Sequence, residues 1–192
     1  IIAFETALVA QIFGAVIFVV NGIGIAMTRE LGPLMTAILF AGRSGSAFAA
    51  QLGTQKVNEE LNALTTFGLS PMYFLVVPRL IASSLVVPLL SVFATILGIL
   101  GGGLVMAMYD ITYTQFYVQL LKSVTVTDIV FGLVKAVIFG FVIALIGCQC
   151  GMNTGAGAAA VGSSTTKSVV KSIIWIVVID GAAALLTNRL GI

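Results

Sequence analysis

Charged residues are sparse in this chain and divide it into long apolar stretches. Lipid accommodates only helices or closed barrels, and no alternating strand pattern is present, so each stretch of roughly 20 residues is expected to form a membrane-spanning helix. We predict four spans, near residues 14–50, 80–109, 129–150 and 170–188. The preceding residues, IIAFETALVAQIF, are expected to be the tail of an earlier span.

The stretch from residue 80 to residue 109 contains no charge, and at about 1.5 Å per residue it would reach about 45 Å. The hydrocarbon core measures roughly 30 Å, so this helix is expected to tilt or to project from the membrane. Composition agrees with a membrane protein: 59% of residues are hydrophobic, 8% are charged, and the mean hydropathy is +1.17. In a soluble domain about a quarter of residues would be charged.

Two connecting segments, 51–79 and 151–171, are richer in positive charge than the third. Their basic residues are Lys56, Arg79, Lys167 and Lys171. The third segment, 110–128, has Lys122 as its only basic residue. Because basic loops remain on the cytoplasmic side of a membrane, we expect the first two segments to be cytoplasmic and the third periplasmic.

A charged pair interrupts the first predicted span. Arg29 and Glu30 lie just before Pro33, which has no N–H for the carbonyl of residue 29 and whose ring crowds it, so a kink is expected. Ionisable groups inside a membrane are costly unless they are paired or hydrated. The pair either neutralises itself, or contacts a neighbouring helix, or borders a polar spot in a cavity, where a lipid headgroup or a gate sits. We favour the last interpretation.

The segment KVNEELNALTTFGLSP has the pattern of a short amphipathic helix outside the membrane. Apolar residues recur at helical spacing, at Val57, Leu61 and Leu64. Glu59 and Glu60 are expected in the first turn, and a glycine and a proline end the helix. Such a helix either lies on lipid headgroups or docks into a cytoplasmic partner, with the two glutamates facing it.

The residue types exclude several kinds of chemistry. The chain has no histidine, which removes imidazole bases and histidine metal ligands. Cys148 and Cys150 are too close together for an easy disulfide and too few for a closed zinc site, so we expect no metal and no cofactor. The string VGSSTTKS lacks the glycines of a nucleotide-binding loop at Val161 and Thr166, so another chain must bind any nucleotide. The small, scattered net charge of +2 argues for neither nucleic acid nor an acidic partner, and we expect no nucleic acid.

The run RELGPLMTAILFAGRSGSAFAAQLGTQKVNEELNALTTFGLSPMYFLVVPRLIA resembles the signature region of MlaE-type permeases. GCQCG and GAAAVGSSTTKSVVKS resemble the last cytoplasmic loop of the same family. These permeases are the membrane subunits of ABC transporters that move phospholipids between the bacterial inner and outer membranes and maintain outer-membrane lipid asymmetry. The resemblance implies an all-α polytopic protein of the inner membrane and a homodimer. It also implies a separate cytoplasmic ATPase, a periplasmic MCE-domain protein and, in many cases, a STAS-domain protein.

The same resemblance implies roles for particular residues. The segment from Val57 to Phe67 matches the coupling helix that docks on the ATPase, and it includes Glu59, Glu60, Leu61 and Leu64. Arg29 and Glu30 match the charged pair near the lipid pocket. The apolar wall of that pocket is matched by Leu8, Val9, Ile12 and Phe13. Residues 1–192 would then form a single permease domain that lacks the N-terminal interfacial helix and most of the first span.

Three other functions remain open from the residues alone. The chain could be a permease for another hydrophobe, such as a sterol or a solvent. It could be a secondary transporter that uses Glu30 as a proton site and needs no ATPase. It could also be a non-transporting scaffold that anchors an MCE protein, and a scaffold would tolerate substitution of Arg29 and Glu30.

Overall fold

The computed structural model describes residues 2–12 and 16–190, and nearly all of these are helical. Within this described part, four helical segments are long and apolar enough to cross a membrane. They are Val16–Val57, Met72–Ala107, Val126–Met152 and Ala158–Thr187. The described ranges contain no strand. The predicted fold class, an all-α polytopic membrane protein with four full spans, is therefore confirmed.

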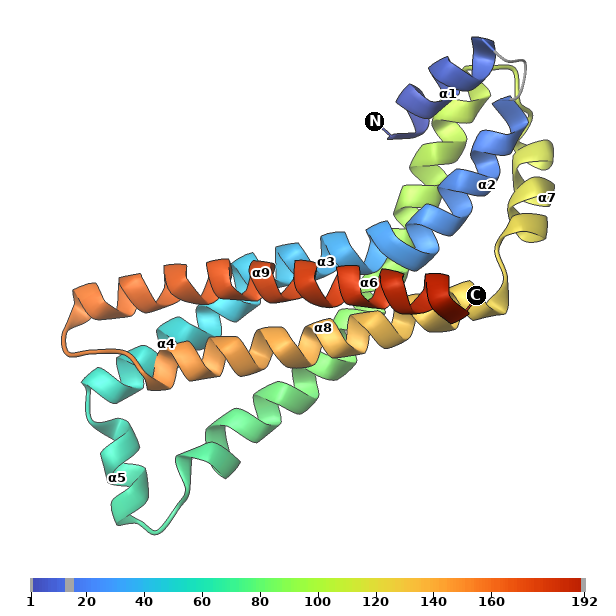
Figure 1. Cartoon of the computed structure of the whole chain (residues 1–192). Helices are drawn as coiled ribbons and strands as arrows, with labels where there is room; N and C mark the ends of the chain where they lie inside the picture. Colours follow the sequence, from blue (N-terminus) through green and yellow to red (C-terminus); the bar gives the residue numbers. More distant parts are fainter. Residues whose placement is uncertain (1, 13–15, 191–192) are drawn as a thin grey trace.

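The first span consists of five helical pieces that follow one another without a break. They are α2 (Val16–Ala26), the π-helical turn η1 (Met27–Leu31), α3 (Gly32–Phe40), a second π-helical turn η2 (Ala41–Gly45) and α4 (Ser46–Val57). At the end of η1 the N–H of Gly32 bonds to the carbonyl of Met27, five residues back. This wider turn accommodates Pro33, and the chain bends between α2 and α3 (Figure 1).

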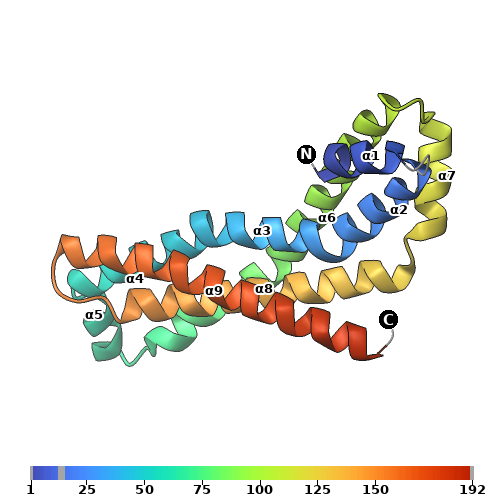
Figure 2. The same cartoon turned by 45° about the horizontal axis from the view of Figure 1, so that its top comes forward.

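The remaining elements complete a bundle and an arm (Figures 1 and 2). They are α1 (Ile2–Ile12), α5 (Glu60–Thr66), η3 (Met72–Val76), α6 (Val77–Ala107), α7 (Tyr113–Ser123), α8 (Val126–Met152) and α9 (Ala158–Leu190). The bundle contains α3, α4, α8, α9 and the first half of α6. The arm contains α1, α2, α7 and the second half of α6, and it leans away from the bundle.

Each part has its own apolar core. In the bundle, α8 lies at the centre and packs against α3, α4, α6 and α9. Phe139 and Ile143 of α8 are fully buried there against Ile176 of α9. In the arm, Val20, Met106 and Phe116 join α2, α6 and α7. The functional region described below lies where the arm meets the bundle.

Two segments predicted as connections are largely helical. In 151–171, α9 already begins at Ala158, where a run of alanines favours a helix. The hydroxyls of Thr165 and Thr166 donate to the carbonyl of Gly162 within this helix. In 110–128, helix α7 begins with a capping box in which the side chain of Gln115 accepts from the backbone N–H of Thr112. Both segments connect the spans as predicted, but much of each connection is helical.

The ends of the molecule are arranged as the four-span prediction requires. Helix α5 and the connection from α8 to α9 lie at one end, and α7 and the C-terminal end of α9 lie toward the other (Figure 1). The two segments predicted to be cytoplasmic therefore share an end. That this end faces the cytoplasm stays a prediction, based on its basic residues.

Candidate functional site

One face of α8 carries the residues that meet η1. Asp128, Gly132 and Lys135 are spaced four and three residues apart, which places them on one side of a helix. All three are buried. A Cβ atom on Gly132 would overlap the carbonyl oxygen of Thr28, so glycine is what allows α8 to approach η1 so closely. This approach brings polar groups from both helices together inside the membrane region.

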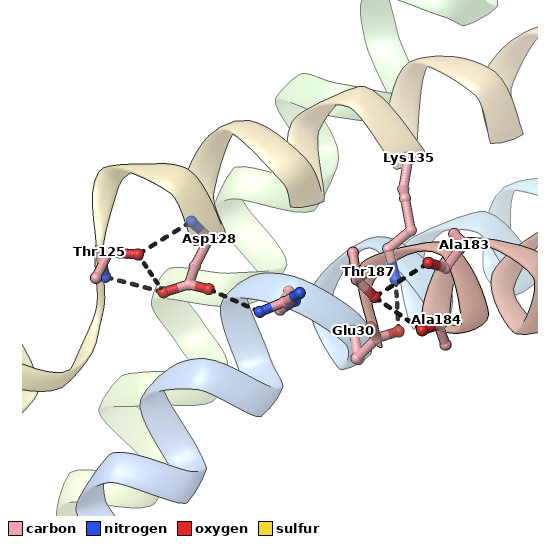
Figure 3. Close-up of polar contacts among 8 residues, drawn as sticks. Glu30, Thr125, Asp128, Lys135, Ala183, Ala184 and Thr187 are labelled. Carbon is pink, nitrogen blue, oxygen red and sulfur yellow. Dashed lines mark hydrogen bonds and ion pairs between the residues drawn. The ribbon is translucent and has the colours of Figure 1, made fainter. Parts of the chain in front are cut away.

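Asp128 has two functions at the start of α8. Its Oδ2 accepts hydrogen bonds from the backbone N–H of Thr125, at 3.0 Å, and from the Thr125 hydroxyl, at 2.7 Å, which caps the helix (Figure 3). Its Oδ1 lies 3.3 Å from Nη1 of Arg29 and forms an ion pair. The guanidinium of Arg29 also lies 5.3 Å from the ring centroid of Phe131, a cation–π contact. The sequence T-V-T-D thus fixes both the helix start and the partner of Arg29.

Lys135 is the central cation of the site. Its side chain is only 2% exposed and extends from α8 toward Glu30 of η1 (Figure 3). Its Nζ lies 2.5 Å from Oε2 of Glu30 and 2.9 Å from Oδ1 of Asp180 on α9. A buried ammonium needs such partners, because an unpaired charge in an apolar interior is very costly. Lys135 therefore ties η1, α8 and α9 together.

The two members of the sequence pair have different partners. Arg29 pairs with α8 through Asp128, and Glu30 pairs with Lys135, so both contact neighbouring helices. Together the five ionisable groups form what we call the charged cluster: Arg29, Glu30, Asp128, Lys135 and Asp180. It contains two basic and three acidic side chains. The binding of lipid by Arg29 and Glu30 stays a prediction.

Sequence reasoning missed three members of the charged cluster. Lys135 and Asp180, which lie inside the third and fourth predicted spans, were not considered, and Asp128 falls in the predicted connection 110–128. A usable signal existed, because a charge inside a span is often paired with an opposite charge on another span. Matching Lys135 with Glu30 and Asp180 would have linked the first, third and fourth spans from the sequence alone.

Two apolar cavities flank η1. The larger, about 600 Å³, lies between α1, α2, η1 and α6 and is lined by Met27, Leu31 and Gly101 among others. The smaller, about 290 Å³, lies between η1, α3, α6, α7 and α8 and is lined by Thr28 and Pro33 among others. Successive residues of η1, Met27 and Thr28, thus face different cavities, and the next two residues belong to the charged cluster.

The described residues of the predicted pocket wall on α1, which are Leu8, Val9 and Ile12, do not line the larger cavity. The residues of α1 that line this cavity are Ala3 and Thr6. Leu8, Val9 and Ile12 are exposed, Ile12 at 80%. Phe13 lies outside the described residues. The assignment of these four residues to a lipid-binding wall stays a prediction.

The predicted coupling helix begins later than expected. Val57 is the last residue of α4, and Glu59 has a left-handed backbone with φ of 61°, so the helix α5 starts at Glu60. The left-handed residue separates the two helices, and the N–H groups of residues 58 and 59 bond back to the end of α4. On α5, Leu61 is buried and Leu64 is half-buried, whereas Glu59, Glu60 and Phe67 are exposed. The exposed residues are thus free to meet a partner.

Comparison with known proteins places this structure in a family. The model of the permease MlaE family matches residues 1–186. A probable ABC transporter permease protein of Synechocystis sp. is 40% identical over 165 residues, covering 85% of this chain and 63% of its own length.

Two further relatives are similar at the same level. A probable ABC transporter permease protein of Rickettsia typhi is 38% identical over 156 residues, or 80% of this chain and 60% of its own length. The chloroplastic protein TRIGALACTOSYLDIACYLGLYCEROL 1 of Arabidopsis thaliana is 38% identical over 159 residues, which cover 82% of this chain and 45% of its own length. The chain spans less than two thirds of the length of these relatives. With the family model covering nearly its whole length, the chain belongs to the MlaE permease family.

Proposed function

We propose that this chain is the membrane subunit of an ABC transporter that moves phospholipids, with the cargo held in the cavities beside η1. The observation that carries this proposal is the position of the charged cluster next to two apolar cavities within the membrane-spanning helices. A two-chain lipid needs apolar volume for its tails and a polar place for its headgroup, and this region offers both. The Arabidopsis relative, named after a diacyl lipid, supports a lipid cargo.

The proposal includes the assembly that such a transporter needs. The family relatives are named as ABC transporter permeases, and we propose that a cytoplasmic ATPase supplies the energy at α5. A second copy of this chain, a periplasmic MCE-domain protein and a STAS-domain protein complete the proposed complex in a bacterial inner membrane. Its role would be the maintenance of outer-membrane lipid asymmetry.

Filling the larger cavity is expected to expel the bound lipid. Gly101 lines this cavity, and a Cβ atom there meets no neighbour within 4 Å. In Gly101→Trp the Cβ atom therefore fits without a clash, and the indole ring is expected to fill the cavity. We expect the purified protein to retain less phospholipid than wild type, measured by lipid extraction and mass spectrometry.

Gly42→Trp is the matched control, because Gly42 also has open space around its Cβ but does not line either cavity. This variant should retain phospholipid at the wild-type level. Equal phospholipid in Gly101→Trp and wild type would contradict the cavity assignment. If the wild-type extract contained a sterol or another neutral hydrophobe in place of phospholipid, that molecule would be the cargo and the phospholipid assignment would be wrong.

Reversal of the acidic residues at α5 is expected to release the ATPase. Glu59 and Glu60 are exposed, so changing both to Lys alters surface charge and leaves the packing of Leu61 intact. The double variant should lose the ATPase in a pull-down and still elute as a folded protein in size-exclusion chromatography. Lys122→Glu, an exposed change on α7 at the opposite end, is the control. Normal co-purification after reversal would instead assign α5 to the surface of the membrane.

A further inference from the structure

A third cavity, of about 200 Å³, lies between the end of α8 and the first half of α9, and its walls are polar. Its lining includes five polar side chains, Gln149, Asn153, Ser164, Lys167 and Lys171. It is located at the α5 end of the molecule, apart from the charged cluster and from the two apolar cavities. The proposed transport site makes no use of it.

Helical spacing explains why these side chains converge. On α9, Ser164, Lys167 and Lys171 are three and four residues apart, so they lie on one face over successive turns. Gln149 of α8 and Asn153, the residue just after its last, are four residues apart and line the cavity opposite them. The two helices together form a cradle of hydrogen-bond donors around a space large enough for a phosphate group.

The charge of the cavity is positive. Among the residues the structure describes, its lining has no acidic side chain, and neither Lys167 nor Lys171 has an ion-pair partner. The last carbonyls of α8 would oppose an anion, but Nζ of Lys56 donates to the carbonyl of Met152 at 2.7 Å. An anion is therefore the ligand that this arrangement favours.

The position of the lysines along α9 indicates the source of the anion. From Lys171 to Arg189 the helix rises about 27 Å, close to the roughly 30 Å thickness of the hydrocarbon core. With Arg189 taken as the opposite boundary, Lys171 is placed at the boundary of the core and Lys167, about 6 Å further out, in the headgroup layer. One turn deeper on the same two helix faces, Leu145 of α8 and Ile174 of α9 are exposed and apolar. Apolar surface that could contact an acyl chain therefore lies one helical turn from the polar cavity.

We propose that this cavity binds the phosphate group of a membrane phospholipid from the leaflet at the α5 end, with Lys167 and Lys171 as the charged ligands. Gln149, Asn153 and Ser164 supply neutral hydrogen bonds to the phosphate oxygens. The acyl chains lie along Leu145 and Ile174. This bound lipid is separate from the transported cargo.

The test is a titration of the purified complex with dioleoyl phosphatidylglycerol, followed by native mass spectrometry. Wild type should bind it, and Lys167→Gln with Lys171→Gln should weaken binding by roughly 30-fold, about 5-fold for each lysine near a lipid surface. Lys122→Gln is the matched control and should not change binding. Gly101→Trp should also leave this site occupied, which separates it from the proposed transport cavity.

Three further measurements identify the source and the class of the ligand. Inorganic phosphate and diacylglycerol should fail to displace phosphatidylglycerol, because the first lacks chains and the second lacks a phosphate. Displacement by inorganic phosphate would contradict a lipid ligand. If the double variant Lys167→Gln, Lys171→Gln weakened the binding of oleate as much as that of phosphatidylglycerol, recognition of the phosphate would be contradicted. If the same double variant bound phosphatidylglycerol normally but lost the ATPase, the proposal would be overturned and the lysines would be assigned to a protein contact.

Discussion

Lys135→Met is expected to lower the thermal unfolding midpoint of the purified protein strongly. The substitution removes the cation between Glu30 and Asp180 and leaves two partly buried carboxylates close to each other. Removing one partner of a buried ion pair costs about 3–5 kcal/mol. The midpoint is measured by heating samples in detergent and following the folded fraction by size-exclusion chromatography.

Two controls separate this effect from a general effect of losing a lysine. Lys122→Met removes an exposed lysine of α7 and should leave the midpoint unchanged. The triple variant Lys135→Met, Glu30→Gln and Asp180→Asn removes the stranded carboxylates as well, so it should recover most of the lost stability. A wild-type midpoint for Lys135→Met alone would show that Lys135 does not hold the three helices together.

Glu30→Arg is expected to reduce lipid transport by at least about ten-fold, because reversing the charge beside the cavities should weaken lipid binding by more than the ~1.4 kcal/mol that a ten-fold change represents. The new cation would lie beside Arg29 and Lys135 and would reverse the local field next to the cavities. Lys135 keeps Asp180 as a partner, and size-exclusion chromatography of the variant checks that it still folds and assembles. Glu30→Gln should be milder, because an amide keeps the size and a hydrogen-bonding oxygen.

The spans could be predicted from the sequence because lipid imposes one requirement, an apolar helix of sufficient length. The residues at which α5 and α9 begin could not be predicted as well as the spans. Residues 158–171 have the glycine, alanine and serine content of a loop, but their hydroxyls bond to helix carbonyls and Ser168 donates to the carbonyl of Gly45 on the first span. That contact depends on tertiary packing. Likewise, the left-handed backbone of Glu59 is not encoded by a glycine that could have signalled it.

In the charged cluster, too, the sequence indicated some residues but not the contacts that depend on tertiary packing. Arg29 and Glu30 were visible in the sequence because charge next to a proline is unusual in an apolar span. Their partners lie about a hundred residues away in the chain, at Asp128 and Lys135, and only the close approach of α8 to η1 brings them together. The π-helical geometry that turns adjacent side chains toward different partners was also beyond sequence reasoning.

The most direct test of the central claim is a lipid-transfer assay with the permease and its ATPase reconstituted in vesicles that contain a labelled phospholipid. Wild type is expected to move the lipid when ATP is present, whereas Glu30→Arg, with normal assembly in size-exclusion chromatography, should remain near the background rate. Transfer at the wild-type rate by Glu30→Arg would show that the charged cluster only holds the helices together. Transfer driven by a proton gradient in the absence of the ATPase would contradict the proposed function itself.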